Sequence, residues 1–323
     1  MTSPLSLFAG FDGGGSKTAC TLCDISGRIL GEGEGGPSNY LYCGEDTALS
    51  SMQAALWAAF REARLAPAQL EAAYVSSAAI RTYDGEKHKP FFARSVDARR
   101  LVCEGDIYPI WYAGARGEPA VVCIVGTGAI TYLFRGSDYI RVSGWGPLLG
   151  DEGSGYDIGL SAARLAMHMH DGRAEMEEAF FRAVLAHFEV AEARLMIGAV
   201  KTDDARKRIA SLARTVCILS AHGSPSANRL LDDAAEETLS SVRAALKRDG
   251  QTDRLPLILS GGLVTPGSLM TERITRLAHC EERILRVTPI DIKPSRICAA
   301  LALREAGENE AAEMLLAKAG GQK

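Results

Sequence analysis

The residues of this chain that could do chemistry begin at the end of its first apolar segment. A run from Leu5 to Phe11 leads to an acid, Asp12, and then to three glycines. Glycines let backbone N–H groups approach an anion closely, hydroxyls add donors, and a carboxylate can hold Mg²⁺ that retains several waters. The spacing is not that of a G-x-x-x-x-G-K-[ST] P-loop, and a plain hairpin turn is the alternative. We predict a metal-holding Asp12, a positive φ at the middle glycine, and a phosphate-binding turn made by Gly13, Gly14, Gly15, Ser16, Lys17 and Thr18.

A second glycine turn follows a later apolar run. Gly126, Thr127 and Gly128 come directly after the segment from Ala120 to Val125. One G-x-G is a weak signal, because hairpins often carry it. Two such turns after equivalent strands could bind a polyphosphate from two sides. We therefore predict that Gly126, Thr127 and Gly128 also bind phosphate.

The segment from Gly144 to Gly155 has five glycines in twelve positions, which is unlike a core element. We expect its Asp151 to accept hydrogen bonds from sugar hydroxyls and its Trp145 to pack near a sugar ring. The alternative for Asp151 is a capping role, since an acid is favourable before a helix.

Two strand ends complete the set of candidate residues. Asp106 follows the apolar residues Leu101 to Cys103, where a carboxylate could take the proton of an alcohol that accepts phosphate. It could instead cap the next segment, Ile107 to Ala115. Gly261 and Gly262 follow the apolar run Leu255 to Leu259, and a strand that ends in two glycines lets a flat nucleoside approach the backbone.

Composition narrows the class of protein. The 323 residues are 47% hydrophobic, which excludes a disordered chain, and the net charge of −4 with mixed signs argues against a nucleic-acid binder. No apolar run approaches the roughly 18 residues that cross a membrane, and no signal peptide is evident, so we expect an intracellular protein. The eight cysteines are too sparse for a disulfide scaffold, and the pair Cys20 and Cys23 is expected to lie on a strand rather than to bind metal.

The order of the expected elements indicates an internal repeat. A strand, a glycine turn and two more strands occur at 7–31 and again at 120–142, and helices and strands follow each unit. We expect two α/β lobes with a ligand cleft between them. Their expected bounds are 1–115 and 116–323, with a last helix, 295–318, that is able to pack back on the first lobe. The remaining strands are expected at 72–78, 99–103, 255–259 and 283–287, and the main helices at 45–64, 156–168, 176–188, 204–220 and 228–247.

These motifs, in this order, resemble the N-acetylglucosamine kinase branch of the BadF/BadG/BcrA/BcrD ATPase family, within the actin–hexokinase–Hsp70 superfamily. The resemblance covers about residues 7 to 305. Its most specific part is Gly144-Trp145-Gly146 followed by Gly150-Asp151-Glu152-Gly153-Ser154. It implies two ribonuclease-H-like lobes, ATP and Mg²⁺, a cytoplasmic homodimer, and phosphorylation of the 6-hydroxyl of an amino sugar. It also implies that Asp106 is the catalytic base, and that Asn39, Asp106, Thr127, Trp145 and Asp151 bind the sugar.

Several alternatives stay open at this point. The sugar could be N-acetylglucosamine, glucosamine or N-acetylmuramic acid. The same family includes ATPase activators of 2-hydroxyacyl-CoA dehydratases, although no suitable cysteine pair for their iron–sulfur cluster is evident. Two further alternatives are a sugar-sensing regulator and a structural or interaction protein whose nucleotide site is inactive. Three positions depart from the pattern of the relatives: Ala129, the bulky segment 107–112, and residues 294–300, which lack a glycine.

Overall fold

The computed structural model describes residues 5–80, 84–202 and 204–319, and it divides the chain into two compact units. Unit 1 comprises Met1–Arg116 and Asp291–Lys323, and unit 2 comprises Gly117–Ile290. The second lobe expected from the sequence, 116–323, is therefore shorter, because the chain returns to unit 1 after Ile290.

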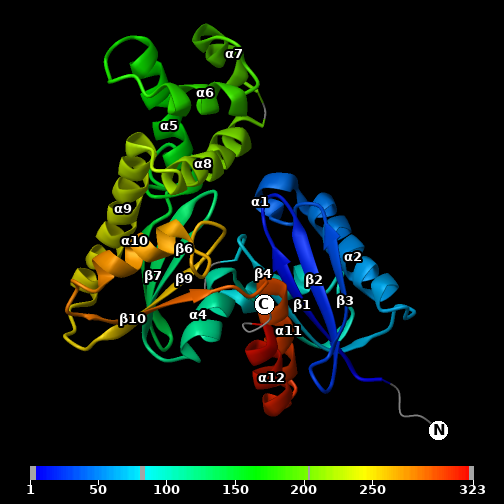
Figure 1. Ribbon diagram of the computed structural model, residues 1–323. Coiled ribbons are helices and arrows are strands. Elements are labelled where there is room, and N and C mark those ends of the chain that lie inside the picture. The colour runs from blue at the N-terminus through cyan, green and yellow to red at the C-terminus, as the bar shows by residue number, and fades with distance from the viewer. Residues whose placement is uncertain (1–4, 81–83, 203, 320–323) are drawn as a thin grey trace. The chain divides into compact units, whose positions relative to one another are not determined.

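Unit 1 is built on a five-stranded sheet with the order β3-β2-β1-β4-β5 (Figure 1). The first three strands form an antiparallel meander, and β4 and β5 run parallel to β1. Its elements are β1 Leu7–Gly13, β2 Thr18–Asp24, β3 Ile29–Gly35, α1 Tyr40–Cys43, α2 Glu45–Glu62, β4 Leu70–Ser77, the 3-10 helix Gly85–His88, α3 Lys89–Phe92, β5 Ala98–Gly105, α4 Ile107–Ala115, α11 Pro294–Glu305 and α12 Asn309–Ala319.

Unit 2 repeats this plan in the order β8-β7-β6-β9-β10. Strands β6 to β8 form the antiparallel meander, and β9 and β10 are the parallel strands. Its elements are β6 Ala120–Val125, β7 Ala129–Arg135, β8 Asp138–Ser143, α5 Gly155–His170, α6 Glu178–His187, the 3-10 helix Ala193–Leu195, α7 Met196–Ala199, α8 Ala205–Ala221, α9 Pro225–Asp249, β9 Leu255–Ser260, α10 Leu269–Ala278 and β10 Ile284–Ile290. The internal repeat and the α/β fold class predicted from the sequence are confirmed.

Glycines on β3 let α2 lie directly on the sheet of unit 1. A Cβ atom added to Gly31, Gly33 or Gly35 would lie 2.0–2.2 Å from backbone oxygens of α2. The helix turns an apolar stripe toward this strand, including Met52 and Phe60, and both side chains are buried. Removing apolar surface from water is the main source of stability for such a layer.

The C-terminal helix α11 joins unit 1 through a similar close approach. A Cβ atom on Gly10 of β1 would lie 2.0 Å from the backbone nitrogen of Ala299. The hydroxyls of Thr21 and Ser295 lie 2.9 Å apart, and Glu32 of β3 pairs with Lys293 and Arg296 at 2.7 and 2.8 Å. These contacts are the physical reason that residues 291–323 belong to unit 1.

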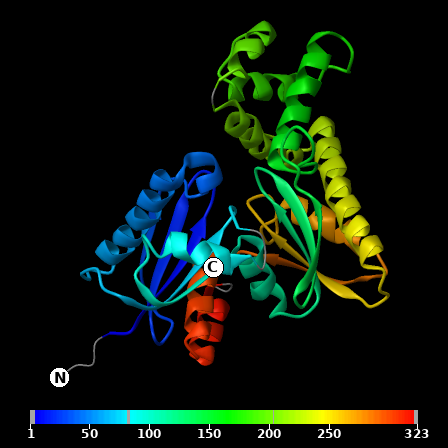
Figure 2. The ribbon, with the colours of Figure 1, turned by 180° about the vertical axis from the view of Figure 1, so that it is seen from behind.

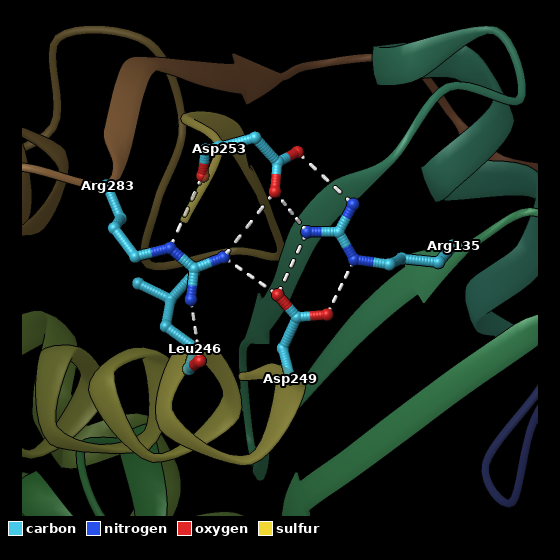
Figure 3. A network of polar contacts seen from close by, with 5 residues as sticks. All are labelled: Arg135, Leu246, Asp249, Asp253 and Arg283. Atoms are coloured by element: carbon cyan, nitrogen blue, oxygen red, sulfur yellow. Dashed lines mark hydrogen bonds and ion pairs between the residues drawn. The ribbon is translucent and has the colours of Figure 1, made fainter. Parts of the chain in front are cut away.

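In unit 2 the helices α5 to α8 gather beyond one end of the sheet, and α9 lies along the sheet (Figures 1 and 2). A cluster of ion pairs fixes the opposite, C-terminal end of α9 (Figure 3). The Asp249 carboxylate, with a side chain only 3% exposed, pairs with Arg135 of β7 at 2.5 Å and with Arg283 at 2.7 Å. Asp253 adds a second, more exposed carboxylate to Arg135, and Arg283 also donates to the carbonyl of Leu246. The cluster thereby connects β7, α9 and the segments before β9 and β10.

The cysteines behave as core residues. Cys20 and Cys23 both lie on β2 and are buried, and burial raises the pKa of each thiol well above its usual range. Over the described ranges no group of three or more His, Cys, Asp or Glu side chains could hold a metal ion. No helix within those ranges is apolar and long enough to cross a bilayer.

Candidate functional site

The turn between β1 and β2 is held by backbone hydrogen bonds. The Gly14 N–H donates to the carbonyl of Lys17 at 3.0 Å, and the Gly14 carbonyl accepts from the N–H groups of Ser38 and Asn39. Gly14 does not have a positive φ, so that expectation is wrong. A Cβ atom on Gly15 would meet nothing within 4 Å, which leaves open space beside the turn. The glycines therefore provide access here rather than a left-handed backbone.

Two side chains of this turn already have partners within unit 1. The Lys17 ammonium pairs with Glu34 at 2.6 Å, and both groups are exposed. The Thr18 hydroxyl is buried and donates to the carbonyl of Gly36 at 2.8 Å. Thr18 thus connects β2 to the end of β3. Ser16, in contrast, is exposed. Phosphate binding by Ser16, Lys17 and Thr18 stays a prediction.

Asn39 adjoins the same turn. It is the N-cap of the short helix α1, and its side-chain oxygen accepts from the N–H of Leu41 at 3.3 Å. The residue is only 4% exposed, and its own N–H binds Gly14. Asn39 therefore lies beside the glycine turn of unit 1, and its side-chain oxygen already has one partner.

Asp12 and Asp106 form an acidic pair in unit 1. Loss of surrounding water, together with the charge of Asp106 and against the opposing charge of Lys17, raises the pKa of Asp12 to about 6. The pKa of Asp106 is also raised, because desolvation outweighs two hydrogen bonds that lower it. These bonds come from the N–H groups of Asp106 and Ile107. Asp106 is the N-cap residue of α4, but its side chain makes no cap hydrogen bond to the second or third residue of the helix, so capping does not explain an acid at this position. Two neighbouring carboxylates with raised pKa values are typical of a site that handles metal ions or protons.

The turn between β6 and β7 in unit 2 is supported by a helix. Its Gly126 N–H donates to the carbonyl of Gly128 at 2.9 Å. The carbonyls of Gly126 and Thr127 accept from the first residues of α5, Gly155 at 2.7 Å and Tyr156 at 3.2 Å. The turn and the start of α5 therefore form one backbone unit.

Asp151 packs against this turn. A Cβ atom on Gly128 would lie 2.8 Å from Oδ2 of Asp151, and Asp151 is only 4% exposed. Its φ is +61°, a left-handed conformation that costs energy for a residue other than glycine and that is often found at functional sites. Its Oδ2 accepts a long contact, 3.5 Å, from the guanidinium of Arg206 of α8.

A different residue caps the helix that follows. Ser154 is the N-cap of α5, and its hydroxyl accepts from the N–H of Asp157 at 3.2 Å. The Asp157 carboxylate in turn accepts from the N–H of Gly153 at 2.9 Å, which completes a reciprocal cap. The alternative that Asp151 is a helix cap is therefore wrong.

Trp145 lies on the same glycine-rich loop and is 63% exposed. The guanidinium of Arg141 lies over its ring at 4.7 Å from the centroid and donates to the carbonyl of Gly144. Gly144 and Gly146 on either side of it have φ values of +70° and +85°, which glycine adopts readily. The loop therefore holds an indole ring at the surface of unit 2.

A pocket of about 310 Å³ opens beside the glycine turn of unit 2. Gly126, Thr127 and Gly262 line it, whereas the neighbouring Gly261 has a φ of +120° and packs against the carbonyl of Val125. The pocket also has a wall that the sequence analysis missed, formed by one face of α8: Lys207, Ala210, Ser211, Ala213 and Arg214. In the sequence of an amphipathic helix, cations that line a pocket look the same as cations on a solvent-exposed face, so no sequence signal indicated them.

The structure thus groups the predicted residues unit by unit. Asp12, the turn from Gly13 to Thr18, Asn39 and Asp106 belong to unit 1. The turn from Gly126 to Gly128, Asp151, Trp145 and Gly262 belong to unit 2. Within each unit an acidic residue lies close to a glycine turn.

Two α/β units with the same strand order, each with a glycine turn after its first strand, define the actin-like ATPase fold. The chain belongs to the BadF/BadG/BcrA/BcrD ATPase family, whose sequence profile matches residues 9–300.

Individual relatives agree with this assignment. The chain is 27% identical over 263 residues to an N-acetylmuramic acid/N-acetylglucosamine kinase of Clostridium acetobutylicum, covering 79% of this chain and 84% of the relative. It is 26% identical to an N-acetyl-D-glucosamine kinase of Dictyostelium discoideum, covering 84% and 89%. A crystal structure of a candidate N-acetylglucosamine kinase from Chromobacterium violaceum matches with a TM-score of 0.69 and 25% identity, covering 97% of this chain and 99% of that one.

Proposed function

We propose that this protein is an ATP-dependent kinase that phosphorylates the 6-hydroxyl of an amino sugar, with N-acetylglucosamine as the preferred substrate. One observation carries the proposal: the strained and nearly buried Asp151 places a carboxylate against Gly128, in the glycine turn that we propose binds phosphate. A kinase needs an acceptor-binding group beside the phosphates. The names of the relatives support the amino sugar as the acceptor.

The proposal gives each candidate residue a role. Asp151 accepts hydrogen bonds from sugar hydroxyls, and Asn39, Thr127 and Trp145 make further sugar contacts. Asp106 accepts the proton of the attacking hydroxyl, for which its raised pKa is favourable. The turns Gly13 to Thr18 and Gly126 to Gly128 bind the phosphates of ATP, and Gly261 and Gly262 line the nucleoside.

Mg²⁺ fits the donor set of unit 1. This ion takes one or two carboxylates together with waters and substrate phosphates, so a protein cage of three ligands is not required. Asp12, with Asp106 close enough to raise its pKa, supplies such a carboxylate. The ion would neutralise charge on the transferred phosphate. The family resemblance also leads us to propose a homodimer in the cytoplasm.

The decisive experiment compares two residues that lie three positions apart. We expect Asp151→Asn to lower kcat/KM for the best sugar by about tenfold to a hundredfold, because charge-assisted hydrogen bonds contribute about 1.5–3 kcal/mol each. Its melting temperature should barely change, since asparagine adopts the left-handed conformation at least as well. A coupled assay of ATP turnover with N-acetylglucosamine, glucosamine and N-acetylmuramic acid measures this loss and ranks the sugars.

Ser154→Ala is the matched control. It removes the actual N-cap of α5, so we expect a loss of about 1 kcal/mol of stability with kcat/KM within a few-fold of wild type. If Asp151→Asn instead lowers stability and leaves sugar turnover normal, the assignment of the sugar site is wrong. If the wild type turns over none of the three sugars, the proposed substrate class is wrong.

A further inference from the structure

Helix α8 presents two cations to the pocket beside the phosphate turn of unit 2. Lys207 and Arg214 both line this pocket and are exposed. Neither side chain has a hydrogen bond or an ion pair to the described part of the chain. The other two cations of α8 do have partners: Arg206 contacts Asp151, and Arg208 donates to the carbonyl of Phe188. Two free cations around a concave site are expected to serve an anionic ligand.

The contacts of α8 give the two cations an order along the pocket. A Cβ atom on Gly155 would lie 3.1 Å from the carbonyl oxygens of both Ala210 and Gly126, so α8 meets the phosphate turn at Ala210. One turn toward the N-terminus, Arg206 reaches Asp151, which packs on Gly128. Lys207 is therefore on the side of the turn where Asp151 lies, and Arg214 is on the other side, about 10 Å further along the helix.

We propose that Lys207 binds the phosphate chain of the nucleotide and that Arg214 contacts its nucleoside. This assignment rests on the proposed function, because Asp151, which packs on Gly128, marks the side of the turn at which phosphate would be transferred. An ammonium is a compact point charge that suits phosphate oxygens. A planar guanidinium can stack on a base or donate to ribose hydroxyls.

The experiment measures affinity against the number of phosphates. AMP, ADP and the non-hydrolysable analogue AMP-PNP are titrated by calorimetry into wild-type protein, without sugar. Lys207→Gln should lower the affinity for AMP little and the affinity for AMP-PNP by about tenfold. The loss of affinity in this variant should therefore grow with each phosphate. Arg214→Gln should weaken all three by a similar factor of about three to ten. Lys247→Gln, an exposed lysine of α9 in the same unit, is the matched control and should bind all three normally.

The outcomes separate this assignment from the function on which it rests. Equal losses of affinity for AMP and AMP-PNP in Lys207→Gln, or no loss of affinity in either variant, would overturn the assignment. If the wild type still binds the nucleotides normally, the proposed function stands. A wild type that binds none of the three nucleotides overturns both. Melting temperatures should match in all variants, because both side chains are exposed and unpaired, so a fall in affinity reports a lost contact.

Discussion

The two units share a strand order but support their glycine turns by different means. In unit 1 the turn after β1 is tied to the segment before α1, through the carbonyl of Gly14 and the N–H groups of Ser38 and Asn39. In unit 2 the turn after β6 is tied to the first residues of α5, and Asp151 packs on it. The five-stranded sheet is thus the repeated part, and the segment that follows its third strand is the part that differs.

This difference indicates how one fold can carry two tasks. After β3 the chain needs only a short link before α2, which lies directly on the glycines of that strand. After β8 it makes the glycine-rich loop with Trp145 and Asp151, and then α5 to α8, which include the wall of the pocket. Unit 1 retains two neighbouring acids, whereas unit 2 gains the pocket. We infer that unit 1 contributes mainly to the chemical step and unit 2 mainly to ligand binding.

The largest effect that tests this division is expected at Asp106. Asp106→Asn should lower kcat by about 10²–10⁴-fold, the usual effect of removing a general base, while AMP-PNP binds normally. A coupled assay of ATP turnover at saturating sugar measures kcat, and calorimetry measures the affinity for AMP-PNP. The exposed Asp138→Asn in unit 2 is the control and should act as wild type. A variant that keeps more than about a tenth of the rate would show that Asp106 is not the base.

The sequence predicted the repeat because each half has strong local signals. Apolar runs that end in glycine turns locate β1 and β6, and the 3–4 spacing of apolar residues locates α2. The departures come from contacts between distant residues. Nothing local indicates that Gly10 of β1 receives α11, or that Ser154 rather than Asp151 caps α5, because capping depends on backbone geometry. Lys207 and Arg214 were missed because a cation on an exposed helix face has no distinctive pattern.

Each unit also contains a carboxylate that binds two cations, and the more buried one should matter more. Hydrogen bonds from Arg135, together with Arg283, lower the pKa of Asp249 to about 2. Asp249→Asn removes the buried carboxylate that Arg135 and Arg283 share and leaves them only the more exposed Asp253, so we expect a loss of about 3 kcal/mol in the free energy of unfolding. Urea unfolding at pH 7 measures it. Asp253→Asn, whose side chain is 51% exposed in the same cluster, is the control and should cost under about 1 kcal/mol. Equal losses at the two positions would contradict the role of burial.

The smallest effect is expected at the corresponding carboxylate of unit 1. Arg296 first, and Lys293 with it, lower the pKa of Glu32 to about 2, but these groups are more exposed than those around Asp249. We expect Glu32→Gln to cost about 1 kcal/mol at pH 7. A carboxyl with a lowered pKa stabilises the fold above its ordinary pKa, and this contribution is lost as the pH falls from about 4 to about 2. Glu32→Gln should therefore unfold with a shallower pH dependence than wild type over that interval, in melting curves recorded at closely spaced pH values. The difference in stability between wild type and variant should be full at pH 7 and nearly absent at pH 2.

Because Glu32 links β3 to α11, proteolysis of the segment after Ile290 should also become faster in the Glu32→Gln variant at pH 7. An unchanged cleavage rate together with an unchanged pH profile would mean that the close packing at Gly10, rather than the ion pairs, holds α11 in unit 1.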